Sequence, residues 1–150
     1  MSIFTTIRRV SYSEILGAPN AQELINEYAA ECSIPDADPQ RQIYAAMEQS
    51  GALQCIGAYI ADELVGFVSI LSGVMPHHGK RVATVESLFV LPSYRHSGAG
   101  NDLLSAAERY ATEAECVAIL YNTRINSRLE KVLLRRYECQ PTHTVYTRWL

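Results

Sequence analysis

The stretch VESLFVLPSYRHSGAGNDLLSAAERYA, residues 85–111, constrains the fold of this chain most strongly. An apolar strand pattern runs up to Pro92, and a helical pattern follows, with apolar residues at Leu103, Leu104, Ala107 and Ala111. The short apolar stretch CVAILYN, residues 116–122, comes next. A strand, a helix and a strand in this order predict a parallel crossover, and therefore a mixed sheet flanked by helices.

Small residues fill the turn between this strand and its helix. Ser97, Gly98, Ala99 and Gly100 would let a ligand approach the main chain, and the first turn of a helix offers unpartnered N–H groups and a partial positive charge. Arg95 adds a planar guanidinium suited to phosphate oxygens. The alternative is a plain turn in which the glycines serve only the bend. The register of strand, arginine, glycines and helix favours a pyrophosphate site.

Two common phosphate-binding loops do not match this turn. A P-loop has a lysine directly after its last glycine, whereas Asn101 follows Gly100. A dinucleotide fingerprint has a third glycine where this chain has Leu103, and no acidic residue ends the next strand. The expected phosphate ligand is therefore bound in another way.

Periodicity and turn residues predict the remaining elements. In chain order, we expect a strand over 3–10, helical segments over 11–32, a helix over 39–49, three strands over 53–62, 63–74 and 80–91, the crossover helix and strand, a helix from Asn126 or Ser127, and a closing strand over 142–150. The three consecutive strands predict an antiparallel meander beside the parallel pair.

Composition excludes several classes of protein. At 150 residues the chain is expected to form a single domain, residues 1–150. A net charge of -3 argues against a nucleic-acid-binding protein. No signal-like apolar region or membrane-length apolar run is present, so we expect a cytoplasmic protein without a membrane partner. The four cysteines form no CxxC pair and His77 adjoins His78, so no metal site is expected.

The stretch 85–111 resembles the central motif of the GNAT superfamily of N-acetyltransferases. That motif is a strand, then [RQ]-x-x-G-x-[GA], then a helix, and here it is RHSGAG, residues 95–100. The resemblance extends to the element order of nearly the whole chain. It implies an α/β (α+β mixed) fold with a central sheet of about six to seven strands and about four flanking helices.

The resemblance also implies acetyl-CoA or CoA as cosubstrate, without a metal. In the family the strand before the loop carries a bulge and splays from its parallel neighbour, and the pantetheine arm lies in the gap. Carried over to this chain, the cofactor-binding residues are Leu88, Phe89 and Val90 on the strand, Arg95, His96, Ser97, Gly98, Ala99 and Gly100 in the loop, and Asn126 after the following strand.

Acetyl transfer requires a neutral amine, and a general base helps because amines are largely protonated near neutral pH. Many family members place such a base where this chain has Glu86. The alternative is that Glu86 pairs with an arginine or lies on a solvated sheet face. The usual general-acid tyrosine is replaced by Leu134, so Tyr137 is the candidate acid, with packing at the helix end as its alternative role. Tyr94, Tyr121 and Tyr146 are lesser candidates.

These observations lead to an acetyl-CoA-dependent N-acetyltransferase that transfers its acetyl group directly to a primary amine of a small molecule, peptide or protein. The identity of the acceptor is left open, and the resemblance leaves room for a homodimer. Leu134 supports an alternative, a weakly active or inactive CoA-binding sensor or interaction module on the same fold. A nucleotide-binding α/β protein is a third possibility, and it predicts a preference for ATP or GTP over CoA.

Overall fold

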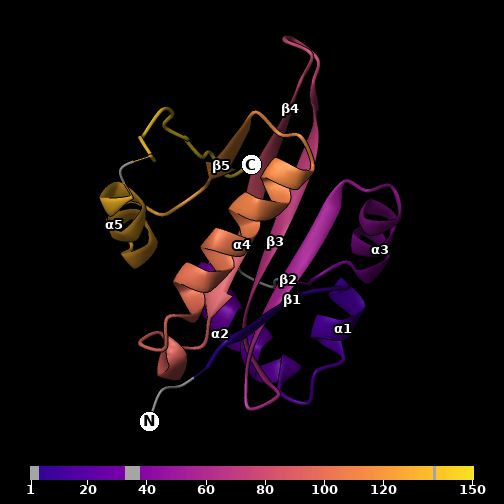
Figure 1. Cartoon of the computed structure of the whole chain (residues 1–150), viewed down its shortest axis with the longest axis vertical. Helices are drawn as coiled ribbons and strands as arrows, with labels where there is room; N and C mark the ends of the chain where they lie inside the picture. Colours follow the sequence, from indigo (N-terminus) through magenta and orange to yellow (C-terminus); the bar gives the residue numbers. More distant parts are fainter. Residues whose placement is uncertain (1–3, 33–37, 137) are drawn as a thin grey trace.

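The computed structural model describes residues 4–32, 38–136 and 138–150 (Figure 1). In chain order the elements are β1 (Thr6–Val10), α1 (Tyr12–Leu16), α2 (Ala21–Cys32), α3 (Arg41–Gln49), β2 (Leu53–Ile60), β3 (Glu63–Met75), β4 (Lys80–Val90), the short 3-10 helix η1 (Pro92–Tyr94), α4 (Ala99–Glu113), β5 (Ala118–Tyr121) and α5 (Arg128–Arg135).

The five strands form one mixed sheet in the order β1-β2-β3-β4-β5. The first three pairs are antiparallel, and β4 and β5 are parallel and connected through α4. The predicted meander and the predicted parallel crossover are both confirmed, and so is the mixed α/β class. The turn between β2 and β3 is tight, with positive φ angles of 48° at Ala61 and 65° at Asp62, as two-residue hairpins require.

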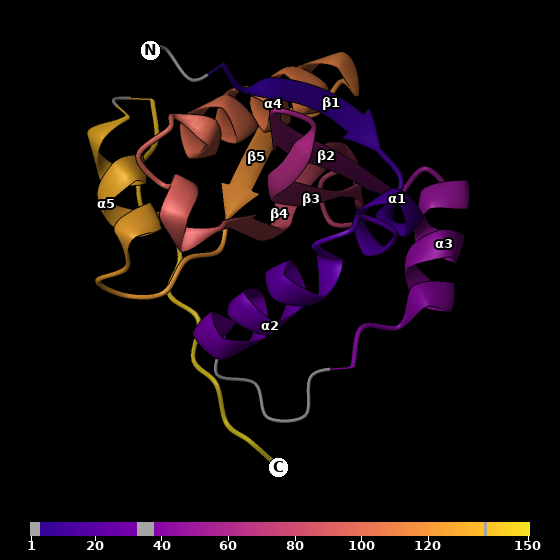
Figure 2. The same ribbon diagram turned by 90° about the horizontal axis from the view of Figure 1, so that it is seen from below.

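Helices cover both faces of the sheet, as the view from below shows (Figure 2). Helix α4 lies on one face, where Leu103 and Ala107 pack with Val68 and Val85. Helices α1 and α2 lie on the other, where Leu24 packs with Phe67 and Phe89. Successive side chains of a strand point to opposite faces, so each of β3 and β4 contributes to both cores.

The sheet is smaller than the six to seven strands expected, because residues 142–150 form no strand. Their alternation of β-branched or aromatic residues with polar ones gives them strand propensity. Propensity alone does not make a strand, since a strand also needs a neighbour to pair with its main chain. In the part of the chain that the structure describes, this segment has no such neighbour.

None of the helices in the described ranges is both long enough and apolar enough to span a lipid bilayer.

Candidate active site

Strand β4 carries a bulge at Glu86. On strand β3, Ser69 pairs with Ser87 and the next residue, Ile70, pairs with Val85, so Glu86 is the extra residue. The parallel pairing with β5 ends at the same level, where Val85 faces Tyr121. From Glu86 to Val90, β4 is therefore paired only with β3. The bulge and the end of β5 together leave an unpaired stretch of main chain on the other side of β4.

One hydrogen bond shows which main-chain N–H and carbonyl groups along this stretch point toward β3 and which point away from it. The N–H of Leu91 donates to the carbonyl of Val65 in β3 at 2.8 Å. Because the polar groups of successive residues alternate between the two edges of an antiparallel strand, those of Leu88 and Val90 face away from β3. The main chain of Phe89 faces β3, and its side chain is buried. Leu88 thus presents both main-chain groups on the open side and Val90 presents its N–H there, since the carbonyl of Val90 accepts from Arg95, whereas Phe89 presents neither.

The unpaired stretch leads directly into the first turn of α4. Gly98 is the N-cap with a φ of 92°, a conformation that favours glycine, and no side chain caps this helix end. The first intrahelical bond runs from the N–H of Asp102 to the carbonyl of Gly98 at 3.1 Å. The N–H groups of Gly98, Gly100 and Asn101 precede it and point out of the helix end. They form the donor set expected of an anion site.

The amides of Ser97 and Ala99 have internal partners. The N–H of Ser97 donates to the carbonyl of Tyr94 at 3.0 Å. The hydroxyl of Ser97 donates to the same carbonyl at 2.6 Å and accepts from the N–H of Ala99 at 3.2 Å. These bonds hold the loop in shape. Of the predicted loop residues, Gly98 and Gly100 are the best placed to donate to a ligand, while Ser97 and Ala99 support them and His96 is exposed.

Space around both glycines is open. A Cβ added at Gly98 would meet no atom within 4 Å, and one added at Gly100 would meet only the Cγ2 atom of Val90 at 3.9 Å. A ligand can therefore approach the main chain here. We call Leu88, Val90 and residues 95–101 together the glycine corner.

The side chain of Arg95 turns back onto the protein. Its Nε donates to the carbonyl of Val90 at 3.0 Å, one terminal nitrogen pairs with Glu31 of α2, and its Cζ lies 5.5 Å from the centre of the Phe89 ring. Arg95 therefore ties the loop to β4 and α2, and its contact with phosphate stays a prediction. Arg128 of α5 is a second guanidinium at the loop, donating to the carbonyl of Arg95 at 3.1 Å.

Asn126 lies in the turn between β5 and α5. It is exposed and has a φ of 63°. Its N–H donates to Oε2 of Glu130 at 2.5 Å, and Ser127 caps the helix that follows. The turn is thus fixed by hydrogen bonds within it, and the predicted contact of the Asn126 side chain with a cofactor stays a prediction.

Glu86 is held by hydroxyl groups. Its carboxylate accepts hydrogen bonds from Ser69 at 2.7 Å, Ser87 at 2.9 Å and Tyr44 at 3.2 Å. Ser69 and Ser87 are buried and also hydrogen-bonded to each other, while Glu86 itself is exposed. In the described part of the chain no arginine pairs with Glu86. The carboxylate is positioned but open on one side, as a group that exchanges protons with a ligand must be.

Tyrosines form a wall beside this carboxylate. The rings of Tyr12 from α1 and Tyr44 from α3 stack with their centres 3.7 Å apart and their planes 9° from parallel. Burial raises the pKa of both phenols above the ordinary value, and for Tyr44 the charge of Glu86 is the next largest cause. Both phenols therefore stay protonated, and Tyr44 remains a donor to Glu86. We call Glu86, Ser69, Ser87, Tyr12 and Tyr44 the carboxylate cluster.

A buried thiol lies beneath the cluster. Cys55 of β2 is fully buried and pairs with Ser69 across the sheet. Burial raises its pKa to about 12, and the carboxylates of Glu48 and Glu86 add to the effect. The thiol therefore stays protonated near neutral pH and lies close to two carboxylates.

Among the described candidates for a general acid, Tyr94 and Tyr121 are hydrogen-bonded to carboxylates other than Glu86. Tyr137 is outside the described residues. Leu134 is 60% exposed and Tyr146 is 91% exposed. The hydroxyl of Tyr121 donates to Glu108 at 3.0 Å and that of Tyr94 to Glu63 at 3.0 Å. These carboxylates contribute to a raised pKa in each phenol, after burial for Tyr121 and as the first cause for Tyr94.

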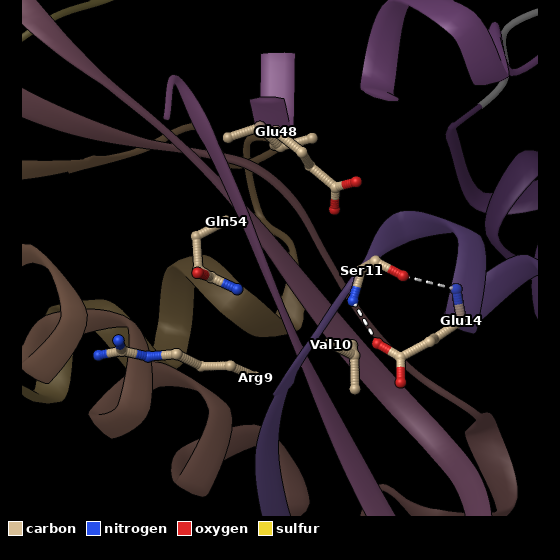
Figure 3. A pocket seen from close by; sticks show the side chains of 7 residues that line it. Arg9, Val10, Ser11, Glu14, Glu48 and Gln54 are labelled. Carbon is tan, nitrogen blue, oxygen red and sulfur yellow. Dashed lines mark hydrogen bonds between the residues drawn. The ribbon is translucent and has the colours of Figure 1, made fainter. Parts of the chain in front are cut away.

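A separate hollow of about 350 Å³ lies where β1 ends and β2 begins (Figure 3). The main-chain N–H of Ser11 donates to the carboxylate of Glu14 at 2.6 Å, and the main-chain N–H of Glu14 donates to the Ser11 hydroxyl at 3.0 Å. Glu48, also in the lining, accepts from the N–H of Tyr12 at 2.6 Å. Ser11, Glu14 and Glu48 thus serve the start of α1, and no residue of the glycine corner lines the hollow.

Groups of three or more potential metal ligands are absent from residues 4–32, 38–136 and 138–150.

Comparison with known proteins identifies the family. The family model of the acetyltransferase (GNAT) family matches residues 21–132, which is more than half of the chain. This protein is therefore a member of the GNAT family of acetyltransferases, and the resemblance seen in the sequence is confirmed. A search among curated proteins finds no significant match to the chain.

Solved structures of acetyltransferases share the fold at low sequence identity. An aminoglycoside acetyltransferase from an uncultured soil metagenomic sample, in complex with sisomicin, has a TM-score of 0.72 and 17% identity, with 97% of each chain covered. The ribosomal-protein-alanine N-acetyltransferase of Brucella melitensis biovar Abortus 2308 has a TM-score of 0.73 and 18% identity, covering 98% of this chain and 99% of that chain.

A third structure carries a CoA derivative. AAC(6')-Iy in complex with the bisubstrate analog CoA-S-monomethyl-acetylneamine has a TM-score of 0.74 and 18% identity, with 98% of each chain covered. A likeness at these identities establishes the fold, and CoA or acetyl-CoA as cosubstrate agrees with the family and with this neighbour.

Proposed function

We propose that this protein is an acetyl-CoA-dependent N-acetyltransferase that transfers an acetyl group directly to a primary amine. One observation carries the proposal: the unpaired stretch of β4, which begins at the Glu86 bulge, runs into the open helix N-terminus at Gly98 and Gly100. An extended chain with amide groups and a pyrophosphate at one end matches that path, and pantetheine diphosphate has this chemistry.

In this proposal the glycine corner holds the cosubstrate through its main chain. The N–H groups of Gly98, Gly100 and Asn101 donate to the pyrophosphate. The main-chain groups of Leu88 and the N–H of Val90 pair with the amides of the pantetheine arm as a neighbouring strand would. Arg128, at the surface of the loop, adds positive charge near the phosphates.

The carboxylate cluster supplies the base. An alkylammonium group has a pKa near ~10.4 and an α-ammonium group near ~7.7–8.0, so a proton must leave before the nitrogen can attack. Glu86 takes it, directly or through a water molecule. The amine nitrogen then bonds to the thioester carbonyl carbon, and a main-chain N–H of β4 stabilises the developing oxyanion. The carbon–sulfur bond breaks, the attacking nitrogen releases its second proton to water and becomes the amide nitrogen, and the CoA thiolate leaves and takes up a proton from solvent.

The acceptor approaches over the Tyr12 and Tyr44 wall. Tyrosine rings and a carboxylate attract an ammonium group and hold its alkyl part. The fold neighbours include proteins named for aminoglycosides and for a ribosomal-protein alanine. We propose the same breadth of acceptor class here, a primary amine on a small molecule or peptide.

Thiol release in a panel of amines tests the proposal. The protein is incubated with acetyl-CoA and with small amines, peptides or aminoglycosides, and free CoA is measured with a thiol reagent. We expect release that depends on both the amine and the protein. A chain that binds neither CoA nor acetyl-CoA in calorimetry would contradict the proposal.

A second candidate is a CoA-binding module without transfer activity. It is favoured by Leu134, which stands at the usual acid position and is 60% exposed. This candidate predicts normal CoA affinity with no thiol release for any amine in the panel. The same experiment therefore separates the two functions.

A further inference from the structure

Three basic side chains lie along one side of α5. Arg128, Lys131 and Arg135 follow one another at intervals of three and four residues, a spacing that places them on the same side of a helix. All three are exposed, whereas Leu133, on another side of α5, is buried. We call Arg128, Lys131 and Arg135 the basic stripe.

No carboxylate in the described part of the chain forms an ion pair with the basic stripe. The ion pairs found there involve other arginines, and the nearby Arg136 pairs with Glu108 of α4. Glu130, the acidic residue of α5, accepts from the N–H of Asn126 at 2.5 Å and so faces the start of the helix. The stripe is therefore a local positive surface on a chain whose net charge is -3.

One end of the stripe lies at the glycine corner. A terminal nitrogen of Arg128 donates to the carbonyl of Arg95 at 3.1 Å, and Figure 2 shows α5 beside the loop that precedes α4. A helix rises about 1.5 Å per residue, so Lys131 and Arg135 follow about 4.5 Å and about 10.5 Å further along the axis of α5. The stripe thus begins beside the proposed pyrophosphate site and extends away from it.

The arginine of the loop itself is occupied by other groups. Arg95 pairs with Glu31 of α2, and its Nε donates to the carbonyl of Val90 at 3.0 Å. Much of the positive charge of Arg95 is therefore balanced within the protein. Positive charge without an acidic partner is supplied to this corner by α5 instead.

CoA carries one phosphate more than the glycine corner can account for. The open amides at Gly98, Gly100 and Asn101 are assigned to the diphosphate, which leaves the 3′-phosphate of the ribose without a partner. That group is one ribose ring away from the diphosphate, and a phosphomonoester carries about 1.5 to 2 negative charges at neutral pH. Guanidinium and ammonium groups are the common protein partners of such a phosphate.

We propose that the basic stripe binds the 3′-phosphate of CoA and that Lys131 and Arg135 distinguish CoA from dephospho-CoA. This inference rests on the proposed function and adds to it a choice between two cosubstrates that differ by one phosphate. Arg128 lies between the diphosphate and the 3′-phosphate, and Lys131 and Arg135 contact the 3′-phosphate. The glycine corner alone would accept both compounds, since they share the diphosphate and the pantetheine arm.

Calorimetry with CoA and with dephospho-CoA tests the proposal. We expect the original chain to bind dephospho-CoA at least about 10-fold more weakly than CoA, because charge-assisted hydrogen bonds to the 3′-phosphate are lost. A double variant with Lys131→Gln and Arg135→Gln should bind CoA as weakly as the original chain binds dephospho-CoA. Its affinity for dephospho-CoA should be unchanged. ADP and its 3′-phosphorylated form should show the same difference without the pantetheine arm.

Arg109→Gln is the matched control. Arg109 is an exposed arginine of α4, well beyond the first turn of that helix, and its replacement removes the same charge. This variant should keep both the Kd for CoA and the preference over dephospho-CoA. Glutamine is a good helix former, so circular dichroism and thermal unfolding should be nearly unchanged in all the variants.

Three results would overturn the proposal and leave CoA binding intact. Equal affinity of the original chain for the two compounds would show that the 3′-phosphate is not recognised. An unchanged preference for CoA in the double variant would place its recognition elsewhere. An equal loss of affinity for both compounds would mean that the stripe acts on the diphosphate. A chain that binds neither compound would contradict the proposed function as well.

Discussion

The glycine corner and the carboxylate cluster adjoin at Glu86, yet the first is formed by main-chain groups and the second by side chains. The corner consists of main-chain groups at Leu88, Val90, Gly98 and Gly100, for which the side chains need only be small or point elsewhere. The cluster consists of side chains from α1, α3, β3 and β4. In the proposed function, the corner binds the cosubstrate through main-chain groups that most residue types carry, and the side chains of the cluster contact the acceptor.

Glu86→Gln tests the cluster most strongly. Glutamine keeps one acceptor oxygen, which can still accept from Ser69 and Ser87, but its amide cannot take a proton at neutral pH. We expect kcat to fall by about 10²–10⁴-fold and CoA affinity to stay unchanged. Steady-state kinetics and calorimetry measure the two quantities. An unchanged pH–rate profile in this variant would remove the base role.

Gly100→Glu tests the corner. A Cβ fits here in ordinary contact with Val90, and a negative charge in the first turn of a helix favours folding. The same charge repels a pyrophosphate, so we expect the Kd for CoA to rise at least about 100-fold, or about 2.7 kcal/mol. Gly98→Trp should act in the same direction, but its φ of 92° adds strain.

Gly51→Trp is the matched control for Gly98→Trp. Gly51 follows α3 and has a φ of 76°, and a Cβ added there would meet no atom within 4 Å. The two substitutions should cost similar stability in thermal unfolding, and only Gly98→Trp should lose CoA. Normal CoA binding by both Gly98→Trp and Gly100→Glu would exclude the phosphate site.

Tyr44→Phe should have a moderate effect within the cluster. It keeps the stack on Tyr12 and removes one donor from Glu86, a contact worth about 1 kcal/mol, so kcat should fall about fivefold. Tyr12→Phe changes the same stack without touching Glu86 and should retain nearly full activity. Equal losses in the two variants, measured by steady-state kinetics, would show that the stack rather than the hydrogen bond matters.

The smallest effect concerns Cys55 at high pH. Its pKa is raised to about 12 in the folded state from 9.0, so between these values the unfolded chain has lost a proton that the folded chain keeps. The contribution of Cys55 to the free energy of unfolding is therefore fully present below pH 9. Above pH 9 it falls by up to about 1.4 kcal/mol per pH unit. Urea unfolding at about pH 8, 9 and 9.5 measures this slope. Cys55→Ala should flatten it, and a slope equal to that of the original chain would contradict the raised pKa of the buried thiol.

The corner was predictable from the sequence because its signals are local. Residues 85–111 contain an apolar strand pattern, a pair of glycines and a helical pattern of apolar residues. Each of these signals can be read from residues that are close together in the chain. The side-chain direction of Arg95 is different, since the carbonyl of Val90 and the carboxylate of Glu31 determine it. The positive charge of Arg95 could be predicted from the sequence, but the direction of its side chain could not.

Most of the contacts in the carboxylate cluster could not be predicted from the sequence. Glu86 stands out as a carboxylate in an apolar strand, but its partners Tyr44 and Ser69 are 42 and 17 residues away in the chain. The bulge at Glu86 has no local signature and depends on the register with β3. The prediction of a closing strand over 142–150 was wrong for a related reason. An alternating pattern indicates a strand but does not specify the neighbour with which it pairs.

Backbone amide NMR during a CoA titration is the sharpest test of main-chain binding at the glycine corner. We expect the largest shifts on Gly98, Gly100 and Asn101 and then on Leu88 and Val90, with ADP reproducing only the first group. Shifts confined to the hollow around Ser11 and Glu14, with the amides of the α4 N-terminus unmoved at saturating CoA, would contradict it.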